Sequence, residues 1–289
     1  MTEQELFQLR REKWRLNGNP IRRIEDARAF IEDVGFCLMY PLRPPILLPT
    51  FIGAFAGAED RLPTWQFAFS DPRSSEATGL MVRLLREHAA YEANPFDENN
   101  AFLLAASVFP YFYALVGERN PKQPPKPGAS SSYSQLACDA FAVIHREGPI
   151  SKQKLLERLA GGLSTAALDK ALAELWSRLR ITRVDYDRSH GSFWDVLYRW
   201  APDAVRAGVE MSVVEAISGL LSKYLDSVIA VEQSELESFF GKFVSRSKVK
   251  DAVNALLSAR ELSFVHVGGK SMLQIAPAKT ATSPRPALK

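Results

Sequence analysis

Residues 134–200 read SQLACDAFAVIHREGPISKQKLLERLAGGLSTAALDKALAELWSRLRITRVDYDRSHGSFWDVLYRW. The run Gln135–Glu147 favours a helix, which ends at Gly148-Pro149 because glycine tolerates the closing turn and proline cannot continue a helix. A second, shorter helix is predicted over Lys152–Leu159, with the Ser151 hydroxyl placed to cap its first turn. The stretch therefore begins with two short helices in close succession.

The second half of this stretch predicts a third helix and a hairpin. Ser164 caps a helix that continues to about Arg178 and carries one apolar stripe at helical spacing. Two β-like segments follow at 180–186 and 192–198, and turn-forming residues join them. Three helices followed by a hairpin is the order of a winged helix, whose third helix enters the major groove of DNA.

The same pattern recurs nearer the C-terminus, after a connector over residues 201–210. Glycines and a serine again mark the boundaries of its elements. Gly241 ends one helix, Ser245 caps the next, and Gly268-Gly269 is a strong signal for a hairpin turn. The two stretches share the same order of helices and strands, but their sequences are not closely similar. The predicted elements are helices over 213–225, 233–240 and 246–259, and strands over 261–267 and 271–275.

We therefore predict a mainly α fold with small β-hairpins (α+β), in which tandem winged helices follow a mixed N-terminal domain. Four prolines, a glycine and serines make residues 121–134 the clearest linker, extended or mobile. The predicted divisions are a mainly helical N-terminal domain at 1–120, the linker at 121–134, winged helices at 135–200 and 201–276, and a disordered tail at 277–289.

Within the N-terminal domain, helices are predicted near both ends and strands between them. Residues 41–49 contain four prolines and are read as a stiff, irregular loop of the kind that often lines a site. This loop, with Tyr40, Trp65 and Tyr111, is the first place to seek a pocket. The predicted helices are 2–16, 25–34, 78–91 and the aromatic run 102–115, and the strand-like segments are 36–40 and 65–69.

Composition excludes several classes of protein. The net charge is only +3, and basic residues concentrate near the N-terminus and around Arg246. Cys37 and Cys138 lie in apolar surroundings, which indicates reduced thiols and a cytoplasmic location. The four histidines lack metal-ligand spacing, and Gly161-Gly162 is not followed by the lysine of a phosphate loop. We expect no metal, no cofactor, no signal peptide and no membrane span.

Double-stranded DNA is the partner that the two winged helices favour. Free N–H groups at helix N-termini suit phosphates, lysines and arginines add charge, and a wing often probes the minor groove. The alternative is that these charges only keep the surface hydrated, since Asp169 and Glu174 dilute them. The candidate DNA-binding residues are Ser151, Lys152, Lys154, Ser164, Lys170, Arg178, Arg188 and His190 in the first winged helix, and Ser245, Arg246, Lys248 and Lys250 in the second.

The chain resembles the winged-helix DNA glycosylase superfamily that includes the interstrand-crosslink and alkylpurine glycosylases. The resemblance covers most of the chain, and it is carried by Gly148-Pro149-Ile150-Ser151, by the helix that follows Ser164, by Trp194-Asp195, by 27–35 and by 110–115. It implies tandem winged helices that grip a duplex, and cleavage of the bond between a base and its sugar.

Members of that superfamily carry a Gln-x-Gln pair that is thought to position the hydrolytic water. This chain has Cys37-Leu38-Met39-Tyr40 at that point, so no catalytic residue is assigned and enzymatic activity stays an open question. The leading hypothesis is a cytoplasmic, bacterial-type DNA-binding protein on a glycosylase scaffold, which removes modified bases if it is an enzyme. The alternatives are a non-enzymatic transcriptional regulator or architectural binder, and a scaffold whose winged helices bind protein.

Overall fold

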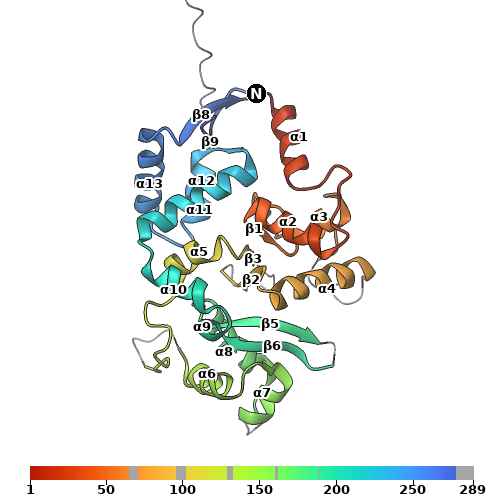
Figure 1. The fold of residues 1–289 in the computed structure, drawn as a ribbon, viewed down its shortest axis with the longest axis vertical. Coiled ribbons are helices and arrows are strands. Elements are labelled where there is room, and N and C mark those ends of the chain that lie inside the picture. The colour runs from red at the N-terminus through yellow and green to blue at the C-terminus, as the bar shows by residue number, and fades with distance from the viewer. Residues whose placement is uncertain (65–70, 96–101, 129–132, 160–161, 188, 278–289) are drawn as a thin grey trace, which may run out of the picture.

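The structure of the protein is a computed structural model that describes residues 1–64, 71–95, 102–128, 133–159, 162–187 and 189–277. Helices dominate it, and the described strands form small antiparallel sheets of three strands each (Figure 1). This confirms the predicted mainly helical class. Within the described residues, no helix is both long and apolar enough to cross a membrane.

The N-terminal part is organised around a sheet with the strand order β1-β3-β2. Strand β3 (Phe102–Ala105) lies in the middle and pairs antiparallel with β1 (Phe36–Leu38) and β2 (Ala90–Ala93). All three strands are buried along their length, so the sheet forms part of the core. The helices of this part are α2 (Ile24–Val34), α3 (Phe51–Ala56), α4 (Pro72–Arg86) and α5 (Phe109–Val116), while the first helix, α1 (Glu3–Lys13), lies apart from the sheet.

Residues 135–200, here called module 1, follow the order predicted from the sequence. The helices are α6 (Gln135–Glu147), α7 (Lys152–Leu159) and α8 (Thr165–Trp176), and the hairpin strands are β5 (Ile181–Asp187) and β6 (Gly191–Val196). The hydroxyls of Ser151 and Ser164 accept the backbone N–H groups of Lys154 and Ala167 at 3.2 Å, which confirms both caps. Strand β4 (Ile150–Ser151) and the short helix α9 (Leu197–Trp200) were not predicted.

Residues 213–275, here called module 2, repeat this order. They contain α11 (Val213–Val228), β7 (Ala230–Val231), α12 (Gln233–Phe240), α13 (Arg246–Ser258), β8 (Leu262–Val267) and β9 (Lys270–Ile275). The connector expected over 201–210 is largely helical, because α10 spans Pro202–Glu210. Ser245 occupies the N-cap position of α13, but its side chain makes no capping hydrogen bond.

Two predictions in the N-terminal part were wrong. The start of the run 102–115 is strand β3 and not a helix, whereas helix α5 begins at Phe109 with Pro110 in its first turn, where the proline was expected to kink the helix or start a new one. A central strand that is buried on both faces has no polar alternation, so its apolar run looks like a buried helix. The helix expected over 78–91 begins earlier, at Pro72, and ends at Arg86, and Ala90–Ala93 is a strand. The strand expected over 65–69 falls outside the described residues.

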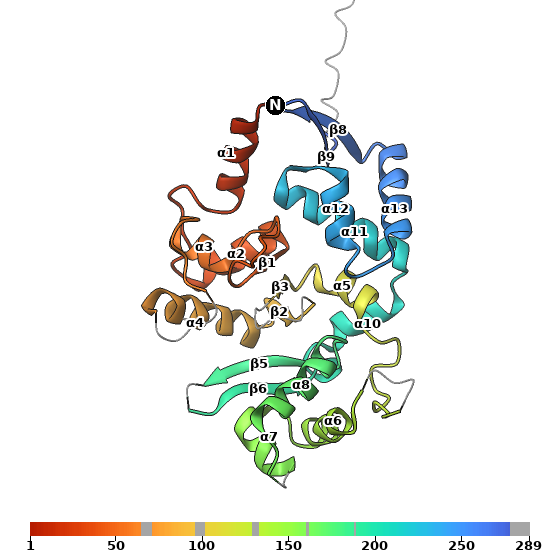
Figure 2. The same cartoon turned by 180° about the vertical axis from the view of Figure 1, so that it is seen from behind.

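The buried residues divide into a large and a smaller core. The large core combines the N-terminal sheet with the helices of module 2, as the stacking of Phe36 on Tyr224 and Phe239 illustrates. Module 1 has its own core, which includes Phe141, Leu172 and Trp194. The modules accordingly lie at opposite ends of the long axis, with α2 to α5 between them (Figure 1), and the view from behind shows the same arrangement (Figure 2).

Helix α1 belongs structurally to the C-terminal end of the chain. Arg10 donates to the carbonyl of Val228 at 2.8 Å, and the indole N–H of Trp14 donates to the carbonyl of Ser227 at 2.8 Å. Leu6 is buried against Ala230 and Val267 of module 2. The first helix of the chain is thus fastened to the end of α11 and to the second hairpin.

Candidate nucleic-acid interface

Those predicted DNA-binding residues of module 1 that the structure describes lie on its surface, apart from the buried cap Ser151. Lys154 and Lys170 are exposed and form no ion pair among the described residues. Lys152 is neutralised by Asp169 of α8, with Nζ 2.5 Å from the carboxylate oxygen. Module 1 therefore offers a diluted positive surface, in agreement with the alternative that acidic neighbours offset these charges.

The turn between β5 and β6 of module 1 contains a cation candidate that is paired with an acid. His190 contacts the carboxylate of Asp187 at 2.8 Å, and this hydrogen bond is the main reason that the pKa of Asp187 is lowered. Arg188 falls outside the described residues. Arg178 is exposed, and its guanidinium lies over the ring of Tyr133 at 5.9 Å. The side chains of His190 and Arg178 thus already contact other groups of the protein.

The start of α13 is more strongly positive. Arg246 and Lys248 are exposed and form no ion pair within the described part of the chain. Lys250, one turn further along, lies 3.8 Å from the carboxylate of Glu237 and is more than half exposed. Ser245 is exposed at the N-cap, where its hydroxyl contacts the hydroxyl of Ser247 at 3.2 Å and makes no capping hydrogen bond to the first N–H groups of α13. These residues, Ser245, Arg246, Lys248 and Lys250, form what is here called the basic end of α13.

The structure does not bring the candidate residues of the two modules into one cluster. Helix α13 lies in the half of the molecule that contains module 2, and α8 lies at the opposite end of the long axis (Figures 1 and 2). Any ligand that contacts both would have to extend along the molecule. A double helix is long enough to do so, whereas a compact ligand is not.

The segment 37–40, where the resemblance would place a glutamine pair, is buried. Cys37 lies in β1 with a fully buried side chain, and Met39 is 2% exposed. Burial raises the pKa of the Cys37 thiol, so it stays protonated near neutral pH. Neither side chain can orient a water molecule for hydrolysis.

A buried ion pair lies on the same sheet, and no pattern in the sequence indicates it. Cys37 is in register with Leu103, and Leu103 is in register with Glu92, so the three residues form one row across the sheet. Glu92 is 0% exposed and accepts two hydrogen bonds from Arg183 of β5, one of them 2.7 Å long. The backbone carbonyl of Glu92 also accepts the indole N–H of Trp176 and the hydroxyl of Thr182.

This ion pair joins the N-terminal sheet to module 1. Arg86 of α4 reinforces the junction through a contact of 2.6 Å to Asp185, two residues beyond Arg183. Both oxygens of Glu92 are occupied by the guanidinium, which is the strong bidentate arrangement of a carboxylate and an arginine. The arrangement explains how a carboxylate can be completely buried, and it serves to position module 1.

One of the aromatic residues named as pocket candidates, Tyr111, lines a pocket among the described residues. Tyr40 is 5% exposed, and Trp65 falls outside the described residues. Tyr111 lines a pocket of about 500 Å³ together with Gly219 and Lys223 of α11. The loop over residues 41–49 contains neither helix nor strand, as predicted. Within the described residues, no group of three or more histidine, cysteine or acidic side chains is arranged to hold a metal.

Comparison with known proteins gives one match. The model of the family described as DNA glycosylase AlkZ-like matches residues 83–288. No curated protein and no solved structure matches the chain. The matched range contains both modules and the ion pair of Glu92 with Arg183, and it leaves out β1 with Cys37 and Met39. Because this range spans more than half of the sequence, the chain belongs to the AlkZ-like DNA glycosylase family.

Proposed function

We propose that this protein binds double-stranded DNA and acts in DNA repair, and that both of its modules are winged helices. The observation that carries the proposal is the family match over residues 83–288, which includes both modules in full. The order of helices and strands within each module supports the assignment of winged helices. The unpaired thiols of Cys37 and Cys138 agree with a cytoplasmic location.

The contact with DNA would be made mainly to the phosphate backbone. Arg246 and Lys248 at the basic end of α13 are exposed and unneutralised, and Lys154 and Lys170 of module 1 have the same character. Each lysine or arginine that neutralises a phosphate releases counterions, which makes the affinity depend on salt. Such contacts fix the position of a protein on the duplex without reading its sequence.

Removal of a modified base is the second candidate function, and family membership favours it. The target base would leave the stack and enter the protein, where an amide or carboxylate would orient water at the sugar. Cys37 and Met39 cannot do this, and Glu92 is held by Arg183. The geometry thus supports DNA binding better than it supports hydrolysis by the pathway of the related glycosylases.

Fluorescence anisotropy with a labelled duplex tests DNA binding directly. We expect binding to undamaged duplex at low salt, with an affinity that falls linearly on a double logarithmic plot against salt concentration. An absence of binding at low salt, to damaged and undamaged duplexes alike, would refute the proposal.

Two further assays separate an enzyme from a binder. Release of free base from alkylated or crosslinked DNA would establish glycosylase activity. A selection from random duplexes that yields a preferred sequence, with no base released, would establish the regulator instead. Because we propose that the contacts are made mainly to phosphates, we expect the selection to show only a weak sequence preference.

A further inference from the structure

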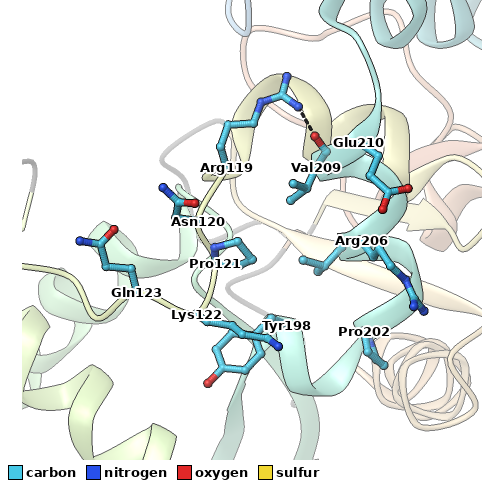
Figure 3. A pocket seen from close by; sticks show the side chains of 11 residues that line it. Arg119, Asn120, Pro121, Lys122, Gln123, Tyr198, Pro202, Arg206, Val209 and Glu210 are labelled. Atoms are coloured by element: carbon cyan, nitrogen blue, oxygen red, sulfur yellow. Dashed lines mark hydrogen bonds between the residues drawn. The ribbon is translucent and has the colours of Figure 1, made fainter.

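A pocket of about 710 Å³ lies between the two segments that connect module 1 to the rest of the chain. One wall is the segment 119–123, where the chain enters module 1, and the other consists of Tyr198 and α10, where the chain leaves it. Figure 3 shows Pro121 and Lys122 on one side, Pro202 and Val209 on the other, and Arg119 reaching across to the carbonyl of Val209. The pocket is lined by Arg119, Asn120, Pro121, Lys122, Gln123, Tyr198, Pro202, Val205, Arg206, Val209 and Glu210.

The entering wall is held in place although its sequence is that of a flexible linker. The side chain of Arg180 is only 1% exposed and donates to the carboxylate of Glu118 at 2.8 Å. The same guanidinium donates to the backbone carbonyls of Asn120 and Gln123. Arg119 ties this wall to α10, since it also donates to the carbonyl of Met211 at 3.1 Å. A ligand would therefore enter a pocket that is already formed, and preformed pockets avoid the entropic cost of ordering.

The lining combines apolar surface with positive charge. Pro121, Pro202, Val205 and Val209 provide aliphatic surface, and Tyr198 adds an aromatic ring and a hydroxyl. Three of the lining residues are cationic and one, Glu210, is anionic, which gives this set a net charge of three minus one, or +2.

The positive charge is available to a ligand. Lys122 is exposed and forms no ion pair within the described residues. The acceptors of Arg119 are neutral carbonyls, so its charge is not cancelled. Arg206 is paired with Asp203, and both side chains are largely exposed, so this pair is weak and easily exchanged.

We propose that this pocket binds a small organic anion with a flat apolar body, in which a carboxylate or phosphate monoester faces Lys122 and Arg119. The volume lies within the range of about 300–1,000 Å³ that is usual for small-molecule sites. A mainly apolar lining with a few convergent charged groups is also typical of such sites. Because the pocket walls are the segments that enter and leave module 1, a bound ligand would contact both of these segments.

The test is a titration of the full chain with the fluorescent probe anilinonaphthalene sulfonate (ANS), which is an aromatic anion. Lys122→Glu reverses the charge at an exposed position, and Val209→Trp fills the pocket. Lys126→Glu is the matched control, because it makes the same change of charge in the same proline-rich segment at a residue that does not line the pocket. Circular dichroism and a thermal melt establish that each variant is folded.

We expect one saturable site whose affinity falls by about tenfold or more in Lys122→Glu, because this variant lacks a charge-assisted hydrogen bond to the probe. Val209→Trp should abolish binding, and Lys126→Glu should bind like the wild type. Equal binding by Lys122→Glu, Val209→Trp and wild type would overturn the proposal.

Competition against bound ANS identifies the class of ligand. Displacement by deoxyadenosine monophosphate would assign a nucleotide, and displacement by benzoate alone would assign an aromatic carboxylate. Benzyl alcohol has a similar ring without the charge, and it should compete much more weakly. If benzyl alcohol competed as well as benzoate, the requirement for an anion would be wrong.

Discussion

The carboxylate of Glu92 and the guanidinium of Arg183 form a bidentate ion pair between residues that lie 91 positions apart in the sequence. Glu92 belongs to the N-terminal sheet and Arg183 to the hairpin of module 1. A fully buried carboxylate needs such a partner, because an isolated charge is costly to remove from water. The pair therefore fixes where module 1 sits.

Removing Arg183 alone should be strongly destabilising. In Arg183→Met the Glu92 carboxylate stays buried without its partner, and we expect the free energy of unfolding to fall by about 3 kcal/mol. Urea denaturation measures this decrease. The double variant Glu92→Leu/Arg183→Met, which removes both charges, should recover most of it, and Asp203→Asn in an exposed pair should stay within about 0.5 kcal/mol of wild type. A double variant no more stable than the single one would contradict this account.

Arg180 should control the order of the segment that enters module 1. Its guanidinium holds the carboxylate of Glu118 and two backbone carbonyls of the segment. In Arg180→Met these acceptors lose their donor, so subtilisin should cut within residues 119–128 faster than in the wild type. Arg178→Met changes an exposed arginine nearby and is the control. Cutting at an unchanged rate in Arg180→Met would show that other contacts hold the segment.

Local signals account for what could be predicted from the sequence. Helices α6, α7 and α12 have the predicted bounds, because glycine, proline or a capping residue marks their ends. The two-residue strands β4 and β7 were not predicted, since each exists only through pairing with a distant strand.

The junction between Glu92 and Arg183 could not be predicted for the same reason. Each residue lies in a short segment whose pattern says nothing about a partner 91 positions away. The basic end of α13 was named from charge alone, and the structure adds that Arg246 and Lys248 are exposed. Whether the candidate residues bind DNA stays a prediction.

Substitutions at the basic end of α13 should weaken DNA binding on all sequences alike. For Arg246→Ala and Lys248→Ala we expect the slope of log affinity against log salt to fall by about one for each phosphate that the variant no longer neutralises. Arg260→Ala is the matched control, because Arg260 lies beyond the other end of the same helix, about 20 Å away. Anisotropy titrations at several salt concentrations give the slope, and an unchanged slope would remove α13 from the interface.

The two thiols should differ in reactivity if β1 stays shielded from solvent. Cys37 is fully buried, and burial raises the pKa of its thiol, so the reactive thiolate is scarce. Burial also raises the pKa of the Cys138 thiol, but Cys138 is only half-buried on α6 and so differs from Cys37 in its access to solvent. With Ellman's reagent we expect one thiol to react in the native protein and two in urea. Rapid reaction of both native thiols would mean that β1 opens to solvent.

The two serines at the starts of the third helices offer a paired test of capping. Ser164 accepts the N–H of Ala167, whereas Ser245 makes no capping bond. Ser164→Ala should therefore lower the free energy of unfolding by about 1 kcal/mol, and Ser245→Ala should change it little. Thermal melts of both variants provide the measurement. If Ser245→Ala lowered the free energy of unfolding more than Ser164→Ala, the Ser245 hydroxyl would have to cap α13, which it does not do in this structure.

The attachment of α1 to the end of α11 has a consequence for synthesis of the protein on the ribosome. Trp14 donates to Ser227, which is translated 213 residues later, and Leu6 packs on Val267. The nascent chain must therefore carry the apolar side of its first helix without a partner until nearly all of it has emerged. Chains that terminate early would keep that surface bare, which is the state that chaperones bind and proteases remove.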